Sequence, residues 1–161
     1  MSVNVETKIV EPGDDAYVEE AWELKERIRQ QENVLHQRRS FFVDAYVQSR
    51  SHLIFAGPYA DELAGFATTR RDGYILFLAV APEYRGEGFG RELVGAVANE
   101  HRTVTCHART SNEDALAFYN HLGFEIVRRI DTYYEDGAPA YYLKLGDDAG
   151  LTTRLFEFFR R

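Results

Sequence analysis

The chain has 161 residues, a net charge of −7, 45% hydrophobic residues and 28% charged residues. The length suits one domain, and the composition is typical of a globular protein rather than a disordered or fibrous one. The longest apolar stretch, residues 74–81, is far shorter than the ~20 residues of a membrane-spanning helix, and the N-terminus has no apolar signal-peptide segment. The acidic balance argues against a general nucleic-acid-binding protein. The single cysteine, Cys106, is compatible with a reducing, cytoplasmic location.

The N-terminal third of the chain predicts one strand and two helical segments. Residues 5–11 have the pattern of an edge strand. Asp14 or Asp15 can cap a helix that runs to about Gln31, because a carboxylate oxygen accepts hydrogen bonds from the first N–H groups of a helix. Residues 33–50 follow as a second helical segment.

The middle of the chain predicts strands. Residues 52–56 and 63–69 are short strands, and residues 71–73 form a tight turn. Residues 74–81 are apolar throughout, which is typical of a central strand covered on both faces.

The second half alternates helices and strands before a final hairpin. We expect a helix to about Glu100 with an apolar stripe, a strand, a helix ended by Gly123, and two strands around a turn. These later elements are residues 103–109, 112–122, 125–134 and 140–145, with the turn at 135–137. The helix between strands 74–81 and 103–109 implies a parallel crossover and a mixed α/β (α+β) fold. We expect one domain over residues 1–146 and a short C-terminal tail over 147–161 that can form a helix.

A glycine-rich turn between a buried strand and a helix is the most informative segment. Gly86, Gly88 and Gly90 lack Cβ atoms, so the backbone can approach a ligand closely. The free N–H groups and dipole of the helix N-terminus favour an anion there, and Arg85 and Arg91 add positive charge. The segment predicts a phosphate or pyrophosphate site, against the alternative of a glycine-rich surface turn.

Two nucleotide-binding motifs do not fit this turn. A dinucleotide site requires G-x-G-x-x-G and an acid about 20 positions later, but the spacing here is G-x-G-x-G and residues 106–110 contain no acid. A Walker loop requires G-K-[ST], whereas Arg91 and Glu92 follow Gly90.

The pattern R-x-x-G-x-G, formed by Arg85, Gly88 and Gly90, resembles the acyl-CoA signature of the GNAT superfamily of N-acetyltransferases. Residues 111–124 are similar to a second block of that family, with an Asn cap, a Tyr two turns later and a closing Leu-Gly-Phe. The resemblance implies a mixed, mostly antiparallel seven-stranded sheet that splays between the fourth and fifth strands, flanked by about four helices. It places acetyl-CoA in the splay.

Within the superfamily, the chain resembles the ribosomal-protein-alanine and protein N-terminal acetyltransferases. Tyr133 and Tyr134 match a tyrosine-bearing hairpin that those enzymes fold over the peptide terminus, although tyrosines are also ordinary strand residues. Residues 30–50 have no clear match to the substrate-side motif of the eukaryotic enzymes, so the peptide preference stays open.

The resemblance implies a role for each matching residue. Tyr119 would protonate the departing thiolate, and His107 with Tyr74 would hold a water that accepts the amine proton. The alternatives are a core tyrosine and a structural strand histidine. The cofactor would contact Leu78, Ala79, Val80, Arg85, Gly86, Glu87, Gly88, Phe89, Gly90, Arg91, Asn112 and Tyr119.

The sequence therefore predicts an acetyl-CoA-dependent N-acetyltransferase acting by direct transfer, with a protein or peptide N-terminal α-amine as the acceptor. One alternative is transfer to a lysine side chain or small amine, and another is a non-catalytic acyl-CoA-binding module. We expect no metal site, since His101, His107 and Cys106 lack a fourth ligand at a usual spacing. We expect no nucleic-acid or membrane partner, and a monomer or homodimer.

Overall fold

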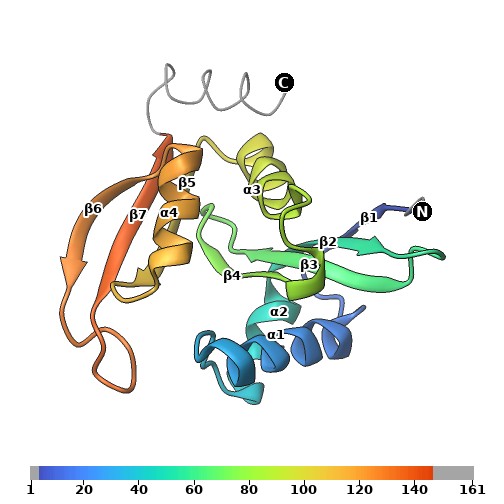
Figure 1. The fold of residues 1–161 in the computed structure, drawn as a ribbon, viewed down its shortest axis with the longest axis horizontal. Helices are drawn as coiled ribbons and strands as arrows, with labels where there is room; N and C mark the ends of the chain where they lie inside the picture. Colours follow the sequence, from blue (N-terminus) through green and yellow to red (C-terminus); the bar gives the residue numbers. More distant parts are fainter. Residues whose placement is uncertain (1–3, 147–161) are drawn as a thin grey trace.

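A computed structural model describes residues 4–146. The elements follow the predicted order (Figure 1). They are β1 (Glu6–Val10), α1 (Val18–Glu32), α2 (Arg39–Gln48), β2 (Arg50–Ala56), β3 (Glu62–Thr69), β4 (Ile75–Val80), the 3-10 helix η1 (Pro82–Tyr84), α3 (Phe89–Glu100), β5 (Thr103–Arg109), α4 (Glu113–Leu122), β6 (Glu125–Ile130) and β7 (Ala140–Gly146). The predicted C-terminal tail, residues 147–161, lies outside the described residues.

The seven strands form two antiparallel sheets that diverge from each other. One sheet has the order β1-β2-β3-β4 and the other the order β5-β7-β6. A single parallel bridge between Tyr74 and Thr105 joins them, and beyond it β4 and β5 separate (Figure 1). This arrangement confirms the predicted mixed fold with a splay between the fourth and fifth strands.

Two hydrophobic cores lie on opposite faces of the first sheet. Phe42 on α2 contacts the rings of Phe66 and Phe77, with centroids 6.0 and 4.6 Å away, and α1 and α2 cover this face (Figure 1). The other core joins α3 and α4 to both sheets, and Leu78 and Val80 of β4 pack against it. The apolar strand β4 is therefore covered on both faces, as its sequence predicts.

The start of α1 differs from the prediction. The N-cap residue is Tyr17, with φ of 63° and no side-chain capping bond. The Asp14 carboxylate instead accepts a hydrogen bond from the Ala16 N–H at 2.9 Å, and so stabilises the turn before the helix. The prediction that Asp14 or Asp15 caps this helix is wrong, because the Asp14 carboxylate bonds to the Ala16 N–H in the preceding turn and not to an N–H group of the helix.

Two predicted elements are shorter than expected because loops replace their ends. Residues 33–38 form a loop, in which Asn33 and Leu35 have φ of 58°. In the hairpin, β6 ends at Ile130 rather than at residue 134. The N–H groups of Tyr133 and Tyr134 both donate to the Ala138 carbonyl at 3.1 Å, which folds residues 131–139 into a compact loop. The two tyrosines therefore lie in a loop and not in a strand.

Candidate functional site

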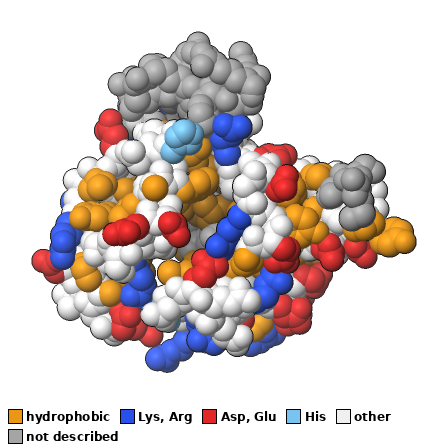
Figure 2. All heavy atoms as spheres, viewed as in Figure 1, with side chains coloured by type: hydrophobic (Ala, Val, Ile, Leu, Met, Phe, Trp, Pro, Cys, Tyr) orange, Lys and Arg blue, Asp and Glu red, His pale blue; other side chains and the backbone are white. Residues whose placement is uncertain are grey.

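A cleft of about 1540 Å³ opens where the two sheets diverge. Its walls come from β4, the glycine loop, α3, α4, β5, and the loops that follow α1 and β6. Hydrophobic side chains are visible in the hollow between α3 and α4, with charged side chains beside it (Figure 2). The cleft contains most of the residues predicted for the site, and the exceptions among them are Glu87 and Tyr74.

The glycine loop leaves open space in front of its backbone. Gly86 and Gly88 have φ of 84° and 85°, and a Cβ atom added to either would meet nothing within 4 Å. A Cβ on Gly90, in contrast, would lie 3.1 Å from the Phe118 ring of α4. Gly88 caps α3 without a side-chain bond, so the first N–H groups of that helix remain available to an anion. The positive φ explains the glycines at 86 and 88, and close packing against Phe118 explains Gly90.

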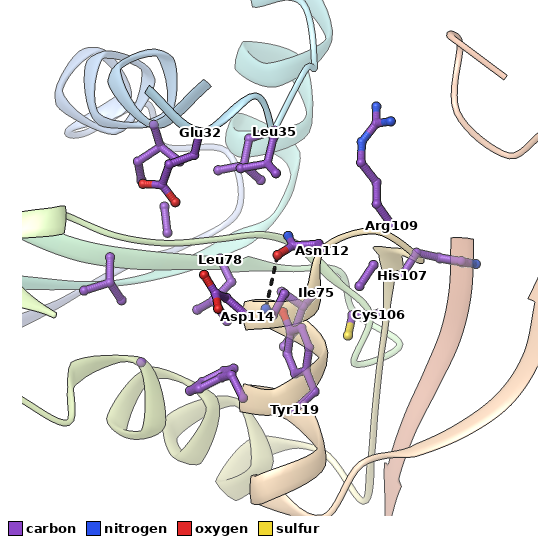
Figure 3. Close-up of a pocket in the computed structure, with 18 of the residues that line it drawn as sticks. Glu32, Leu35, Ile75, Leu78, Cys106, His107, Arg109, Asn112, Asp114 and Tyr119 are labelled. Carbon is purple, nitrogen blue, oxygen red and sulfur yellow. Dashed lines mark hydrogen bonds between the residues drawn. The ribbon is translucent and has the colours of Figure 1, made fainter. Parts of the chain in front are cut away.

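Arg85 is held at the rim of the cleft by two partners. Its Nε donates to the Val80 carbonyl at 3.2 Å, and its guanidinium pairs with the Glu32 carboxylate at 2.8 Å. Figure 3 shows Glu32 and Leu35 across the cleft from Tyr119. The charge expected at this loop is therefore partly balanced by a carboxylate from the end of α1.

The free edge of β4 faces the cleft. The Ala81 N–H bonds to β3, so the alternation of an antiparallel ladder directs the Val80 and Leu78 N–H groups to the opposite edge. On that edge, no described strand pairs with β4 beyond the Tyr74–Thr105 bridge. Leu78 and Val80 therefore direct backbone polar groups towards the cleft, whereas those of Ala79 point towards β3.

Asn112 and Tyr119 sit on α4, on the opposite wall. The Asn112 side chain accepts a hydrogen bond from the Ala115 N–H at 3.1 Å and so caps the helix (Figure 3). Tyr119 is 8% exposed, and its ring packs against that of Phe124 with centroids 5.0 Å apart. Burial raises the pKa of its hydroxyl well above the ordinary value, so this group stays protonated and can donate a proton or a hydrogen bond.

His107 lies within a cluster of aromatic side chains. Its Nδ1 is 2.5 Å from the Tyr74 hydroxyl and 3.3 Å from that of Tyr133. The Tyr133 ring stacks on the imidazole with centroids 4.3 Å apart. Burial, and then the positive charges of Arg128 and Arg70, lower the pKa of His107. The structure thus brings together the predicted pair of His107 and Tyr74 and keeps the imidazole neutral near pH 7.

The loop after α1 supplies cleft residues that sequence reasoning missed. Its backbone is anchored by Lys25, a fully buried side chain whose ammonium donates to the Gln37 carbonyl. Arg38 in this loop pairs with Glu135 of the β6–β7 loop at 3.5 Å, so the two loops meet at the cleft. Asparagine often ends helices in a left-handed conformation, so Asn33 was the available indication of a loop here. The residues of this loop that line the cleft are Val34, Leu35, His36, Gln37 and Arg38, and Ser40 and Phe41 at the start of α2 follow them.

Comparison with known proteins identifies the family. Residues 15–124 match the acetyltransferase (GNAT) family. The chain belongs to the GNAT acetyltransferases. No helix of this GNAT protein, within residues 4–146, combines the length and apolar character needed to cross a membrane.

Among curated relatives, the chain is 41% identical to the Arabidopsis thaliana N-alpha-acetyltransferase MAK3 over 78 residues, which cover 45% of this chain and 41% of the relative. It is 28% identical to human N-alpha-acetyltransferase 30 over 155 residues, which cover 84% of this chain and 43% of that protein. The chain therefore spans less than half the length of each of these two relatives.

Solved structures share the fold. The ribosomal-protein-S18-alanine N-acetyltransferase of Escherichia coli has a TM-score of 0.67 at 22% identity, over 87% of this chain and 93% of that one. A chain of the NatC complex bound to Gag peptide and CoA has a TM-score of 0.69 at 18% identity, over 89% and 99%. The family match confirms the predicted superfamily, these structures confirm the fold, and the roles of individual site residues remain predictions.

Proposed function

We propose that this GNAT chain is an acetyl-CoA-dependent N-acetyltransferase whose acceptor is the N-terminal α-amine of a protein or peptide. One observation carries the proposal. The His107 imidazole, which is hydrogen-bonded to Tyr74 and has a pKa lowered by burial, lines the same cleft as the open backbone of Gly86 and Gly88 at the N-terminus of α3. Relatives named N-alpha-acetyltransferases support the choice of acceptor.

The cleft fits acetyl-CoA, which would supply an acetyl group activated as a thioester. The space in front of Gly86 and Gly88 can admit a pyrophosphate, and the N–H groups of α3 can donate to it. The free edge of β4 can hydrogen-bond the amide groups of the pantetheine arm. The residues that would hold the cofactor are Leu78, Ala79, Val80, Arg85, Gly86, Glu87, Gly88, Phe89, Gly90, Arg91, Asn112 and Tyr119.

His107 would accept the proton of the acceptor amine through a water molecule. A neutral imidazole has one N–H and one lone pair. In the tautomer protonated at Nδ1, the Tyr74 hydroxyl accepts that hydrogen bond and Nε2 carries the lone pair. An α-amine has a pKa near 8 and a lysine near 10.4, so deprotonating lysine costs roughly 3 kcal/mol more. A base with a lowered pKa therefore suits an α-amine better than a lysine side chain.

Tyr119 would donate its hydroxyl proton to the departing thiolate. Because burial keeps the hydroxyl protonated, the proton is present when negative charge develops on the sulfur. Tyr133 and Tyr134, in the loop that faces residues 35–38, would contact the peptide next to its terminus. The Leu78 and Val80 N–H groups would stabilise the oxyanion of the tetrahedral intermediate.

Matched peptides test this proposal. Each peptide is supplied with a free α-amine and no lysine, or with a blocked N-terminus and one lysine, and acetylated products are read by mass spectrometry. We expect turnover of the first set and poor turnover of the second. Efficient acetylation of the blocked set, or of a small amine alone, would move the protein to the first alternative. Acetyl-CoA binding without turnover of any acceptor would favour a non-catalytic module.

A further inference from the structure

The His107 imidazole belongs to a row of side chains that crosses the second sheet. His107 on β5 is the register partner of Tyr142 on β7, and Tyr142 is the partner of Arg128 on β6. The His107 and Tyr142 ring centroids are 4.9 Å apart, and the Arg128 guanidinium carbon lies 5.0 Å from the Tyr142 centroid. The Arg128 guanidinium is therefore separated from the imidazole by the Tyr142 ring.

The charge of Arg128 is not balanced by a neighbouring carboxylate. Within residues 4–146, no ion pair involves Arg128. The adjacent Arg129 pairs with Asp131 at 3.0 Å, and Arg70, which lies over the Tyr74 ring, pairs with Asp72 at 2.7 Å. Arg128 is exposed and its side chain is held by contact with an aromatic ring. Its positive charge therefore acts on the site without local compensation.

The other groups that face the imidazole carry no opposing charge. The phenol rings of Tyr74, just before β4, of Tyr133 in the β6–β7 loop and of Tyr142 on β7 surround it. No carboxylate in the described part of the chain hydrogen-bonds to His107. Nothing in the first layer around the ring therefore offsets the repulsion between Arg128 and an imidazolium.

We propose that Arg128, acting across Tyr142, disfavours protonation of the His107 imidazole and so extends the pH range in which it can act as a base to lower pH. A nearby positive charge disfavours the charged form of histidine, as does partial burial. Arg128 contacts neither substrate in this scheme, so it is a positioning residue that acts through electrostatics. The inference rests on the proposed role of His107 as the base.

The test is the titration of His107 in Arg128→Gln, followed by NMR of the imidazole C–H signals. The protein has five histidines, and the His107 signal is identified by its absence from His107→Ala. We expect the midpoint to rise by roughly 0.3 to 0.6 pH unit, the size that Coulomb's law gives for a charge about 10 Å away in a mostly aqueous setting. The midpoint of the acid limb of kcat/KM should move to higher pH by the same amount. High salt should reduce the difference in midpoint between Arg128→Gln and the wild-type protein.

The chain offers a matched control in the next residue. Arg129→Gln removes the same formal charge one position away, and we expect it to leave both the His107 titration and the activity limb unchanged. Arg128→Lys should preserve the wild-type behaviour. Equal shifts in both Gln variants, or no shift in Arg128→Gln, would overturn the proposal.

Failure of this inference is distinguishable from failure of the proposed function. A His107 midpoint that moves while the activity limb stays would refute the role of Arg128 in supporting a base, even with acetyl transfer intact. Absence of acetyl transfer in the wild-type protein would instead refute the proposed function.

Discussion

Tyr119 is the residue whose buried hydroxyl has the most specific expected role. Tyr119→Phe should lower kcat by ~10²-fold or more if this hydroxyl protonates the leaving thiolate. The affinity for acetyl-CoA should barely change, because the ring and its contact with Phe124 remain. Rapid-quench kinetics under conditions where chemistry limits would measure the loss, and calorimetry the affinity.

A suitable control is Tyr46→Phe, which removes another buried hydroxyl. Tyr46 is fully buried and donates to the Ala16 carbonyl at 2.6 Å, away from the cleft. This variant should lose some stability and keep its kcat. A wild-type rate in Tyr119→Phe would assign Tyr119 to the core alone.

The lowered pKa of His107 fixes the direction of the pH dependence. As pH falls through that value, the imidazole gains a proton and can no longer act as a base, so kcat/KM should fall. Since burial and neighbouring arginines place the pKa below its ordinary 6.5, the midpoint of this limb should lie below pH 6.5. A second limb near 8 should report the α-amine itself.

Substitution of the pair tests the same assignment. His107→Ala should remove the lower limb and cost ~10²-fold at neutral pH, with a smaller loss at higher pH where the free amine is already neutral. Tyr74→Phe should cost less, and the two losses should not add, because the residues are in contact. A double variant with near-normal rates at pH 7 would remove both from the mechanism.

At the scale of the element, the glycine loop predicts a cofactor defect without unfolding. Gly88 has φ of 85° and open space in front of its Cα, and Asp tolerates this left-handed region better than most residues. Gly88→Asp should therefore fold, while its carboxylate opposes an anion at the N-terminus of α3. Calorimetry should give a sharply weaker acetyl-CoA affinity.

Gly90, in the first turn of α3, provides the contrasting control. An added Cβ would meet the Phe118 ring at 3.1 Å, so Gly90→Ala should mainly lower the melting temperature by disturbing the contact between α3 and α4. Unchanged acetyl-CoA affinity in folded Gly88→Asp would remove the loop from the cofactor site.

The elements themselves were largely predictable, and the loops were not. Strong periodicity identified β4, α3 and α4, because their burial follows directly from the pattern of apolar residues. The loop over residues 33–38 depends instead on a buried ammonium, Lys25, bonded to a distant carbonyl. The end of β6 depends on the Ala138 carbonyl, which accepts two N–H groups. The pattern of apolar and polar residues in the sequence indicates neither of these hydrogen bonds.

At the scale of the whole molecule, the motifs predicted the splay and much of the site, but not how its walls are joined. The resemblance placed Tyr74 beside His107, and the 2.5 Å contact agrees. The pairing of Glu32 with Arg85 brings α1 against the glycine loop. It joins exposed side chains 53 positions apart, and such partners depend on the assembled fold rather than on local sequence.

The same architecture predicts the kinetic mechanism. One cleft contains both the glycine loop and the His107 cluster, so the acetyl donor and the amine can occupy it together and react directly. The one cysteine of the chain, Cys106, is 2% exposed, and burial raises the pKa of its thiol to about 12. A thiol that stays protonated is a poor nucleophile. Initial-rate plots with both substrates varied should therefore intersect, as a ternary complex requires, and Cys106→Ala should retain most of the activity. Parallel plots, together with an acetylated protein mass that disappears in Cys106→Ala, would establish transfer through the cysteine instead.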